Sequence, residues 1–225
     1  KKKKSVKVVQ YNTELYEFKP NLYQFLDNIT SLKNKKILDW GCKTGGLLFF
    51  SEGEIKQENY TGVDVNSKSL KVLKDTFPKT DTIHYNRYNN SYNHDGKEYT
   101  PWCLKDKYDV IFSYSVFTHT SFREFKDVFT RHQEHLNKDG IMIHTFADIK
   151  NKEHTQYLLT EKQFKMYSPN FEELYRYDDE LSIEYRDKKC NIFNSLFDFN
   201  YVEEKLDCYV DQNSPLLTTA IYERT

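Results

Sequence analysis

The stretch KKILDWGCKTGG, residues 35–46, decides the fold class because a short apolar run is followed at once by clustered glycines. Three of the 7 glycines in this chain of 225 residues fall here, at Gly41, Gly45 and Gly46. Glycine tolerates positive φ and lets the backbone approach a ligand without an obstructing Cβ. A buried strand, a glycine-rich loop and a helix, in this order, are typical of α/β sheets that hold nucleotide-like ligands.

Strand-like segments continue through the chain, separated by helical ones. They are YTGVDVN (60–66), DTIHYN (81–86), KYDVIFSYS (107–115), IMIHTFA (141–147), YVEEKLDCYV (201–210) and LLTTAIYER (216–224). A short turn joins the last two, which makes them antiparallel. We therefore expect one α/β domain over residues 1–225, with a Rossmann-like, doubly wound, seven-stranded sheet. This sheet is mostly parallel with an antiparallel last strand, and helices cover both faces.

Two segments lie outside this alternating pattern. Residues 1–33 contain apolar side chains at helical spacing and predict an N-terminal helical cap. Residues 148–186 are polar and helix-prone, and we expect them to form an inserted lid that carries substrate specificity.

Two aspartates end the first two predicted strands. Asp64 follows Asp39 by 25 positions, and a carboxylate at the end of the second strand can accept hydrogen bonds from both hydroxyls of a ribose. Asp39 would repel a pyrophosphate but attract a cationic amine. Lys43 stands where a dinucleotide-binding loop has its second glycine. Both features disfavour an NAD-dependent oxidoreductase.

The motifs resemble those of the class I S-adenosylmethionine-dependent methyltransferases. The matching stretches are ILDWGCKTGG, YTGVDVN, YDVIFSYSVFTHT and HLNKDGIMIHTF, in the family's order. The resemblance covers roughly residues 30–147 and 187–225, and Lys43 replaces a glycine that is usual in the family. It implies S-adenosyl-L-methionine as cofactor and S-adenosyl-L-homocysteine as product.

The resemblance also implies roles for individual residues. The cofactor-binding residues would be Asp39, at the amine; Gly41 and Cys42, through their backbone; Gly45; Asp64, at the ribose; Val65, against the adenine; Asn86, at the adenine amine; and Ser113 and Tyr114, at the methionine portion. Asn90, Asn93 and Asp95 are alternatives to Asn86 at the adenine amine. Asn66 is either a further adenine contact or a helix N-cap. Histidine has a suitable pKa for a general base, so the catalytic candidates are His119, then Tyr114 and His144.

Charge, apolar runs and cysteine spacing narrow the function further. The net charge is −1, with 33 basic and 34 acidic residues, which gives no general reason to bind nucleic acid or an anionic membrane. No apolar run reaches the length of a membrane span, and the 4 cysteines are far apart, as in a reducing cytoplasm. His132 and His135 lack an evident third ligand, so we expect a solvated helix face and no metal.

The sequence thus predicts a cytoplasmic methyltransferase acting on oxygen or nitrogen of a small polar metabolite. A sugar, a surface-polysaccharide precursor or a phosphorylated compound would suit, and Arg87, Arg123 or Arg176 would bind a phosphate. The alternatives are an RNA or protein methyltransferase and a non-catalytic S-adenosylmethionine-binding partner subunit.

Overall fold

The computed structural model describes residues 22–89, 92–120, 122–148, 196–197, 209–211 and 218–225. Its helices are α1 (Leu22–Ile29), α2 (Gly46–Phe50), α3 (Ser67–Thr76) and α4 (Phe122–Glu134), with 3-10 turns η2 (Gln57–Asn59) and η3 (Phe117–His119). Its strands are β1 (Ile37–Trp40), β2 (Tyr60–Asp64), β3 (Asp81–His84), β4 (Tyr108–Ser113), β5 (Leu136–Asp148), β6 (Leu196–Phe197), β7 (Tyr209–Asp211) and β8 (Thr218–Glu223).

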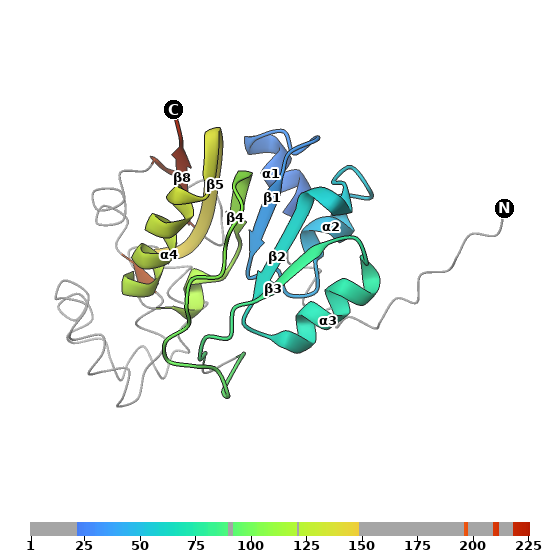
Figure 1. The fold of residues 1–225 in the computed structure, drawn as a ribbon. Coiled ribbons are helices and arrows are strands. Elements are labelled where there is room, and N and C mark those ends of the chain that lie inside the picture. Colours follow the sequence, from blue (N-terminus) through green and yellow to red (C-terminus); the bar gives the residue numbers. More distant parts are fainter. Residues whose placement is uncertain (1–21, 90–91, 121, 149–195, 198–208, 212–217) are drawn as a thin grey trace, which may run out of the picture.

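The sheet has the strand order β3-β2-β1-β4-β5-β8-β7 (Figure 1). Strands β1 to β5 are mutually parallel, and β8 pairs antiparallel with both β5 and β7. This confirms the mostly parallel sheet with an antiparallel last strand. The predicted count of seven differs, because a two-residue strand, β6, also pairs with β5 and brings the sheet to eight strands within the described residues.

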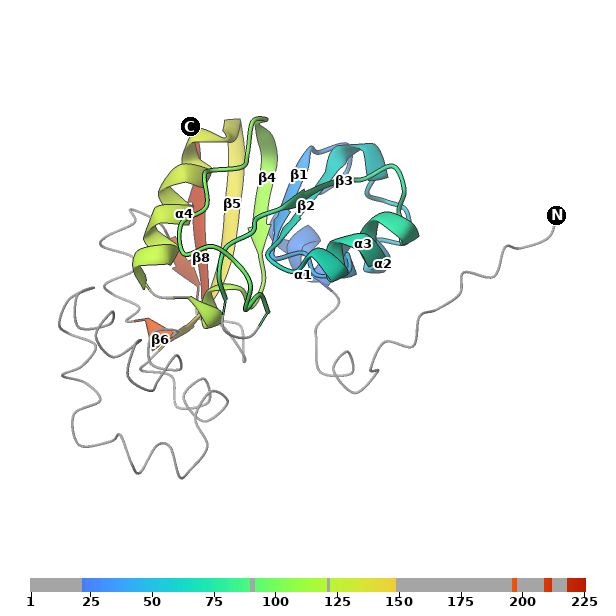
Figure 2. The same ribbon diagram turned by 60° about the horizontal axis from the view of Figure 1, so that its bottom comes forward.

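Helices cover both faces of the sheet, as the doubly wound prediction requires. Figure 2 shows α1, α2 and α3 on one side of the strands and α4 on the other. Successive side chains of a strand point to opposite faces. Along β1, Ile37 therefore packs with Leu47 and Leu73 below one helical layer, whereas Leu38 packs with Phe125 of α4.

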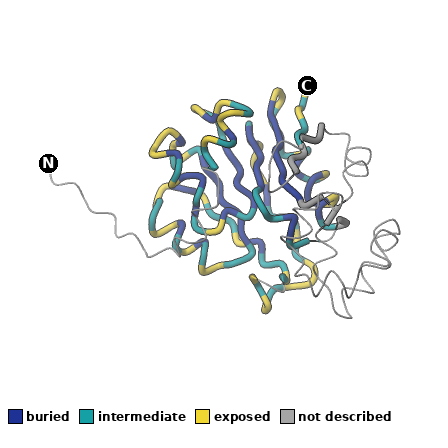
Figure 3. The backbone as a smooth tube through the Cα atoms, turned by 180° about the vertical axis from the view of Figure 1, so that it is seen from behind, coloured by how far each residue is buried: buried dark blue, intermediate teal, exposed yellow. Residues whose placement is uncertain are grey.

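The central strands are buried along their whole length (Figure 3). Strands covered on both faces read as continuous apolar runs, which explains the patterns ILDW in β1 and YTGVD in β2. Because Asp39 and Asp64 belong to these runs, their carboxyl groups are buried, with 5% and 8% of the residue surface exposed.

The chain reverses direction across the sheet between β1 and β4. From β1 it moves to β2 and β3 on one side, and it then returns to β4 and β5 on the other. Ligands of open α/β sheets bind outside the carboxyl ends of the strands at such a switch point.

The predicted cap and lid are only partly covered by the structure. Helix α1 confirms helical structure within residues 1–33, and the remainder of that prediction lies outside the described residues. Almost all of the proposed lid at 148–186 also lies outside them. In the part of the chain that is described, none of the helices is both long and apolar enough to cross a membrane.

Candidate functional site

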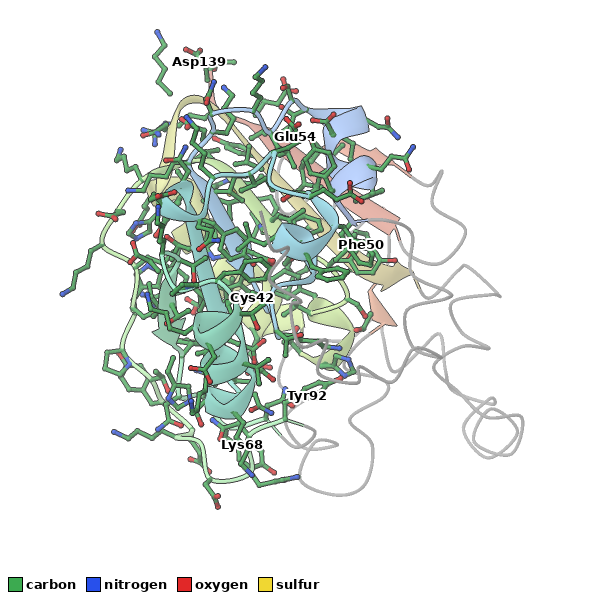
Figure 4. All side chains as sticks on the ribbon, turned by 90° about the vertical axis from the view of Figure 1, so that its right-hand side faces the viewer. Cys42, Phe50, Glu54, Lys68, Tyr92 and Asp139 are labelled. Carbon is green, nitrogen blue, oxygen red and sulfur yellow. The ribbon has the colours of Figure 1, made fainter. Side chains whose placement is uncertain are left out.

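A cavity of about 680 Å³ lies at the carboxyl ends of the strands on both sides of the switch point. The residues that follow β1, β2, β3 and β4 line it, together with one face of α4. Figure 4 shows Tyr92 and Lys68 at this end of the molecule and Asp139, near the start of β5, at the opposite end. Of the residues predicted from the sequence, the cavity is lined by Gly41, Asp64, Val65, Asn66, Arg87, Tyr114 and His119.

Gly41 lets the loops after β1 and β4 pack against each other. Its φ is 81°, a left-handed conformation that glycine adopts without steric cost, and its N–H donates to the Val63 carbonyl at 2.7 Å. A Cβ added at Gly41 would collide with Cγ2 of Val116. The bare backbone at Gly41 therefore shapes the cavity wall between β1 and β4.

Lys43 keeps the loop conformation that a glycine would give. Its φ is 49°, in the left-handed region, and its N–H donates to Oδ2 of Asp64 at 2.8 Å. Gly45 serves helix packing, since a Cβ at its φ of 86° would lie 2.5 Å from Cδ1 of Leu73 in α3. Gly45 does not line the cavity, so a direct cofactor contact is not supported for it.

Asp64 joins the loop after β1 to the turn after β2. Its Oδ1 accepts the N–H of Asn66 at 2.8 Å, and its Oδ2 accepts the N–H of Lys43. Burial raises the pKa of Asp64, and the hydrogen bonds from the loop amides oppose this shift. A carboxylate offers about four lone-pair positions, so two remain for hydroxyl groups of a ligand in the cavity. Asn66 caps α3 by accepting from the N–H groups of Lys68 and Ser69, and it also lines the cavity.

Asp39 lies on the other face of β1 and does not line the cavity. Its Oδ2 accepts a hydrogen bond of 2.5 Å from the buried hydroxyl of Tyr60, and burial raises its pKa to about 7. The side chain of Cys42 is buried on the same face, against Gly62, and its N–H donates to Val63. Neither Asp39 nor Cys42 lines the cavity: both support the loop from within the core, and their direct contacts with a cofactor stay predictions.

Ser113 and His144 form a buried pair instead of facing the cavity. The Ser113 hydroxyl lies 2.8 Å from Nδ1 of His144, and Nε2 of His144 lies 3.4 Å from Nδ1 of His132. None of these three residues lines the cavity. His144 is thus placed as a core residue and cannot reach an acceptor, which corrects its candidacy as a base. Ser113 is likewise buried, and its contact with the methionine portion stays a prediction.

The predicted solvated helix face at His132 is wrong. Its side chain is fully buried against the ring of Trp40, at a centroid distance of 4.8 Å. His135 points elsewhere, where it accepts from the indole N–H of Trp102. Among the described residues there is no group of three His, Cys, Asp or Glu residues that could hold a metal ion.

Acid is expected to destabilise the fold through His132 and His144. Burial lowers the pKa of both, that of His144 to about 3, so the unfolded chain takes up protons first as the pH falls below 6.5. Each such proton removes about 1.4 kcal/mol of stability per pH unit. Asp39 acts oppositely: with its pKa raised to about 7, the folded chain takes up a proton and gains stability over the same range.

Urea denaturation between pH 7 and pH 5 measures this balance. The two histidines lower the free energy of unfolding as the pH falls from 7 to 5, and the raised pKa values of Asp39 and Asp64 oppose this change. In Asp39→Asn the compensating proton uptake is removed, and the fall should be steeper by about 1 kcal/mol per pH unit. Equal slopes for the wild type and Asp39→Asn would contradict the buried, protonated state of Asp39.

Asn86 holds the loop after β3 together and does not line the cavity. Its side-chain oxygen accepts from Nδ2 of Asn93 at 3.0 Å, and its carbonyl accepts from Lys97 and Thr100. The prediction that Asn86 meets an adenine amine is therefore not supported. Asn89 of the same loop does line the cavity.

Tyr114 and His119 remain beside the cavity, in the segment after β4. The ring of Tyr114 packs edge-on against Phe25 of α1, at 6.1 Å. Nε2 of His119 lies 3.2 Å from the hydroxyl of Tyr92. His119 is the catalytic candidate from the sequence that has a titratable ring nitrogen at the cavity.

The cavity also has an aromatic and charged wall, of which the sequence predicted Arg87 alone. The members that it missed are Trp40, Tyr85, Tyr88, Tyr92, Tyr99, Glu124, Asp127 and Arg131. Arg87 forms an ion pair of 3.2 Å with Glu124, and Arg131 one of 2.9 Å with Asp127. The spacing of Glu124, Asp127 and Arg131 along α4 was a usable signal, because residues three and four apart share one helix face.

The chain is similar to proteins of one family. A family model described as "Methyltransferase domain" matches residues 38–142. Protein 235L of Invertebrate iridescent virus 6, which carries the name methyltransferase, is 20% identical over 185 residues, 78% of this chain and 64% of that protein. The chain thus spans slightly less than two thirds of this curated relative.

Solved structures share the fold. A TehB-like S-adenosylmethionine-dependent methyltransferase from Corynebacterium glutamicum has a TM-score of 0.55 and 12% identity, covering 95% of this chain and 93% of that one. An S-adenosylmethionine-dependent methyltransferase from Clostridium acetobutylicum has a TM-score of 0.57 and 12% identity, with coverages of 95% and 96%. The strand order and these matches show that the chain has the fold of S-adenosylmethionine-dependent methyltransferases of known structure, and that residues 38–142 are similar to a methyltransferase domain.

Proposed function

We propose that this protein transfers the methyl group of S-adenosyl-L-methionine to an oxygen or nitrogen atom of a small polar metabolite. The observation that carries the proposal is the position of Asp64 in the cavity wall, at the carboxyl end of β2 and beside the glycine-containing loop after β1. A sulfonium nucleoside needs a carboxylate that accepts from its ribose hydroxyls. It also needs a loop whose backbone can approach the ligand closely. Both features line this cavity.

The residues in the cavity fit this cofactor. Asp64 would accept from the ribose, and Val65 would lie against the adenine, since both line the cavity next to each other. The backbone of Gly41 would face the methionine portion. Asp39 would attract the amine of the cofactor only by electrostatic interaction over a distance. Bound S-adenosylmethionine supplies an electrophilic methyl group, and the protein supplies orientation and a base.

The walls of the cavity support a small, polar acceptor. A volume of about 680 Å³ is within the range of small-ligand sites. Arg87 and Arg131 are already paired with Glu124 and Asp127, which makes Arg87 a weaker phosphate-binding candidate than the sequence suggested. Tyrosine rings between paired charges suit an uncharged polyhydroxy compound such as a sugar or a surface-polysaccharide precursor.

A labelled-methyl transfer screen tests the proposal. The protein is incubated with S-adenosylmethionine labelled in the methyl group and with separate pools of sugar nucleotides, phosphorylated metabolites, RNA and unmodified protein. We expect label in a small-molecule pool, lost in the variant Asp64→Ala. Transfer to RNA or to protein would replace the proposed acceptor class. Cofactor binding without transfer to any pool would favour a non-catalytic partner subunit.

A further inference from the structure

Three loops of the cavity meet at the side chain of Tyr92. The ammonium group of Lys43, from the loop after β1, lies 5.6 Å from the centre of the Tyr92 ring. The Tyr92 hydroxyl lies 3.2 Å from Nε2 of His119, from the segment after β4. The two rings meet edge to face, with centroids 5.0 Å apart. All three residues line the cavity, and Figure 4 shows Tyr92 at the end of the molecule where the cavity lies.

Hydrogen bonds between Asn89 and the backbone hold this cluster in place. The side-chain oxygen of Asn89 accepts from the N–H of Tyr92 at 3.1 Å, and Nδ2 of Asn89 donates to the His119 carbonyl at 3.3 Å. Two further bonds of 3.0 and 2.9 Å close the turn between Asn89 and Asn93. Asn89 therefore ties the backbones of Tyr92 and His119 to each other. Tyr92 is nevertheless 38% exposed, so its hydroxyl can meet a ligand.

We propose that Tyr92 is a further catalytic residue, whose hydroxyl takes the proton of the methyl acceptor and passes its own proton to Nε2 of His119. The proposal rests on the methyl transfer proposed above. The proposal adds Tyr92 to the predicted base, His119, as a second proton-transferring group. It also gives a role to Lys43, which stands where the methyltransferase glycine motif usually has a glycine.

The position of Lys43 sets the direction of proton transfer. A cation over the face of a phenol ring attracts its electrons and stabilises the phenolate form. Tyr92 is thereby a better hydrogen-bond donor, so its O–H should donate to Nε2 of His119, and this donation polarises the phenol oxygen toward the proton of the methyl acceptor. Imidazole takes up a proton near neutral pH, which makes His119 the final proton acceptor.

The proposed step balances for an acceptor hydroxyl. A bond forms between the acceptor oxygen and the methyl carbon, and the carbon–sulfur bond breaks with its electron pair remaining on sulfur. The acceptor's O–H bond breaks and its proton moves to the Tyr92 oxygen, while the Tyr92 proton moves to Nε2. The positive charge of the sulfonium is replaced by that of the imidazolium of His119.

Nitrogen NMR of the histidine rings tests the hydrogen bond without an acceptor substrate. In protein labelled with ¹⁵N-histidine, the signals of His119 are those lost in His119→Gln. At a pH where the ring is neutral, we expect one tautomer, with Nε2 unprotonated. In Tyr92→Phe the His119 signals should move to the averaged positions of two tautomers. Lys43→Met should move them in the same direction by less, and Lys43→Arg should leave them near the wild type.

Tyr88→Phe is the matched control for this spectrum. Tyr88 lies in the same loop, lines the same cavity and is also 38% exposed, and no described hydrogen bond joins it to His119. Its removal should leave the His119 signals in place. A proton on Nε2 in the wild type, or unchanged His119 signals in Tyr92→Phe, would overturn the proposal.

Kinetics with an acceptor from the labelled-methyl screen provide a second test. Tyr92→Phe should lower kcat about 100-fold, a usual effect of losing a proton-transferring group, and should leave the Kd of S-adenosylmethionine unchanged. An unaltered kcat would overturn the role of Tyr92 even where the NMR result agrees. Absence of S-adenosylmethionine binding in the wild type would instead refute the methyl-transfer function itself, so the two failures are distinguishable.

Discussion

Asp64→Ala is expected to weaken the binding of S-adenosylhomocysteine at least about 100-fold. Hydrogen bonds to a charged group contribute roughly 1.5–3 kcal/mol each, and a ribose offers two hydroxyls to this carboxylate. The substitution also leaves the N–H groups of Lys43 and Asn66 without their acceptor, so the loop that shapes the cavity is loosened. Isothermal titration calorimetry of the purified variant measures the loss.

A shorter ligand separates the ribose from the amino-acid portion. 5′-Methylthioadenosine has the same ribose as S-adenosylhomocysteine and lacks the amine and carboxylate. Asp64→Ala should weaken both ligands by a similar factor, and Asp64→Asn, which keeps one oxygen acceptor, should weaken both less. A loss confined to S-adenosylhomocysteine would contradict a ribose contact at Asp64.

Gly41→Ala is expected to destabilise the protein by roughly 3 kcal/mol and to close part of the cavity. Two costs add at this position. A non-glycine residue at a φ of 81° is disfavoured by about 1–2 kcal/mol, and the new methyl group collides with Val116, at a cost of about 1–3 kcal/mol for overpacking. Chemical denaturation measures the change in the free energy of unfolding.

Gly53→Ala is the matched control for Gly41→Ala. Its φ is 97°, also left-handed, but no atom lies within 4 Å of an added Cβ. Gly53→Ala should therefore show only the backbone cost of about 1–2 kcal/mol. In Gly41→Ala combined with Val116→Ala, the collision is relieved and part of the stability should return. Equal losses in Gly41→Ala and Gly53→Ala would show that contact with Val116 has no effect.

Local patterns were sufficient to predict the sheet and one wall of the site. The apolar runs ILDW and YTGVD, followed by glycines or a helix cap, predict parallel strands because both faces of such strands are buried. The carboxyl ends of these strands meet at one edge, which correctly brought Gly41 and Asp64 to one cavity.

Side-chain direction within a strand explains why Asp39 does not line the cavity. Alternation places Asp39 on the face of Ile37, below α1 to α3, and turns Trp40 toward the cavity. The alternation of side chains along ILDW was a usable signal for this direction. Tyr60, which donates to Asp39, is 21 positions away and gives no local signal.

Long-range pairing explains the remaining errors. His132 and His144 belong to a helix and a strand whose contact depends on how α4 packs on the sheet, and no local spacing predicts it. Asn89 lines the cavity and Asn86 does not, and this difference depends only on how the irregular loop after β3 folds. A loop rich in asparagine and tyrosine offers several equivalent candidates, so sequence alone could not choose Asn89 and Tyr92.

The central claim is that the cavity beside Asp64 binds a sulfonium nucleoside. Calorimetric titration of the wild-type protein with S-adenosylmethionine, and separately with NAD, tests it most directly. The account predicts saturable binding of one S-adenosylmethionine per chain and no binding of NAD. Saturation with NAD and no heat with S-adenosylmethionine would contradict it.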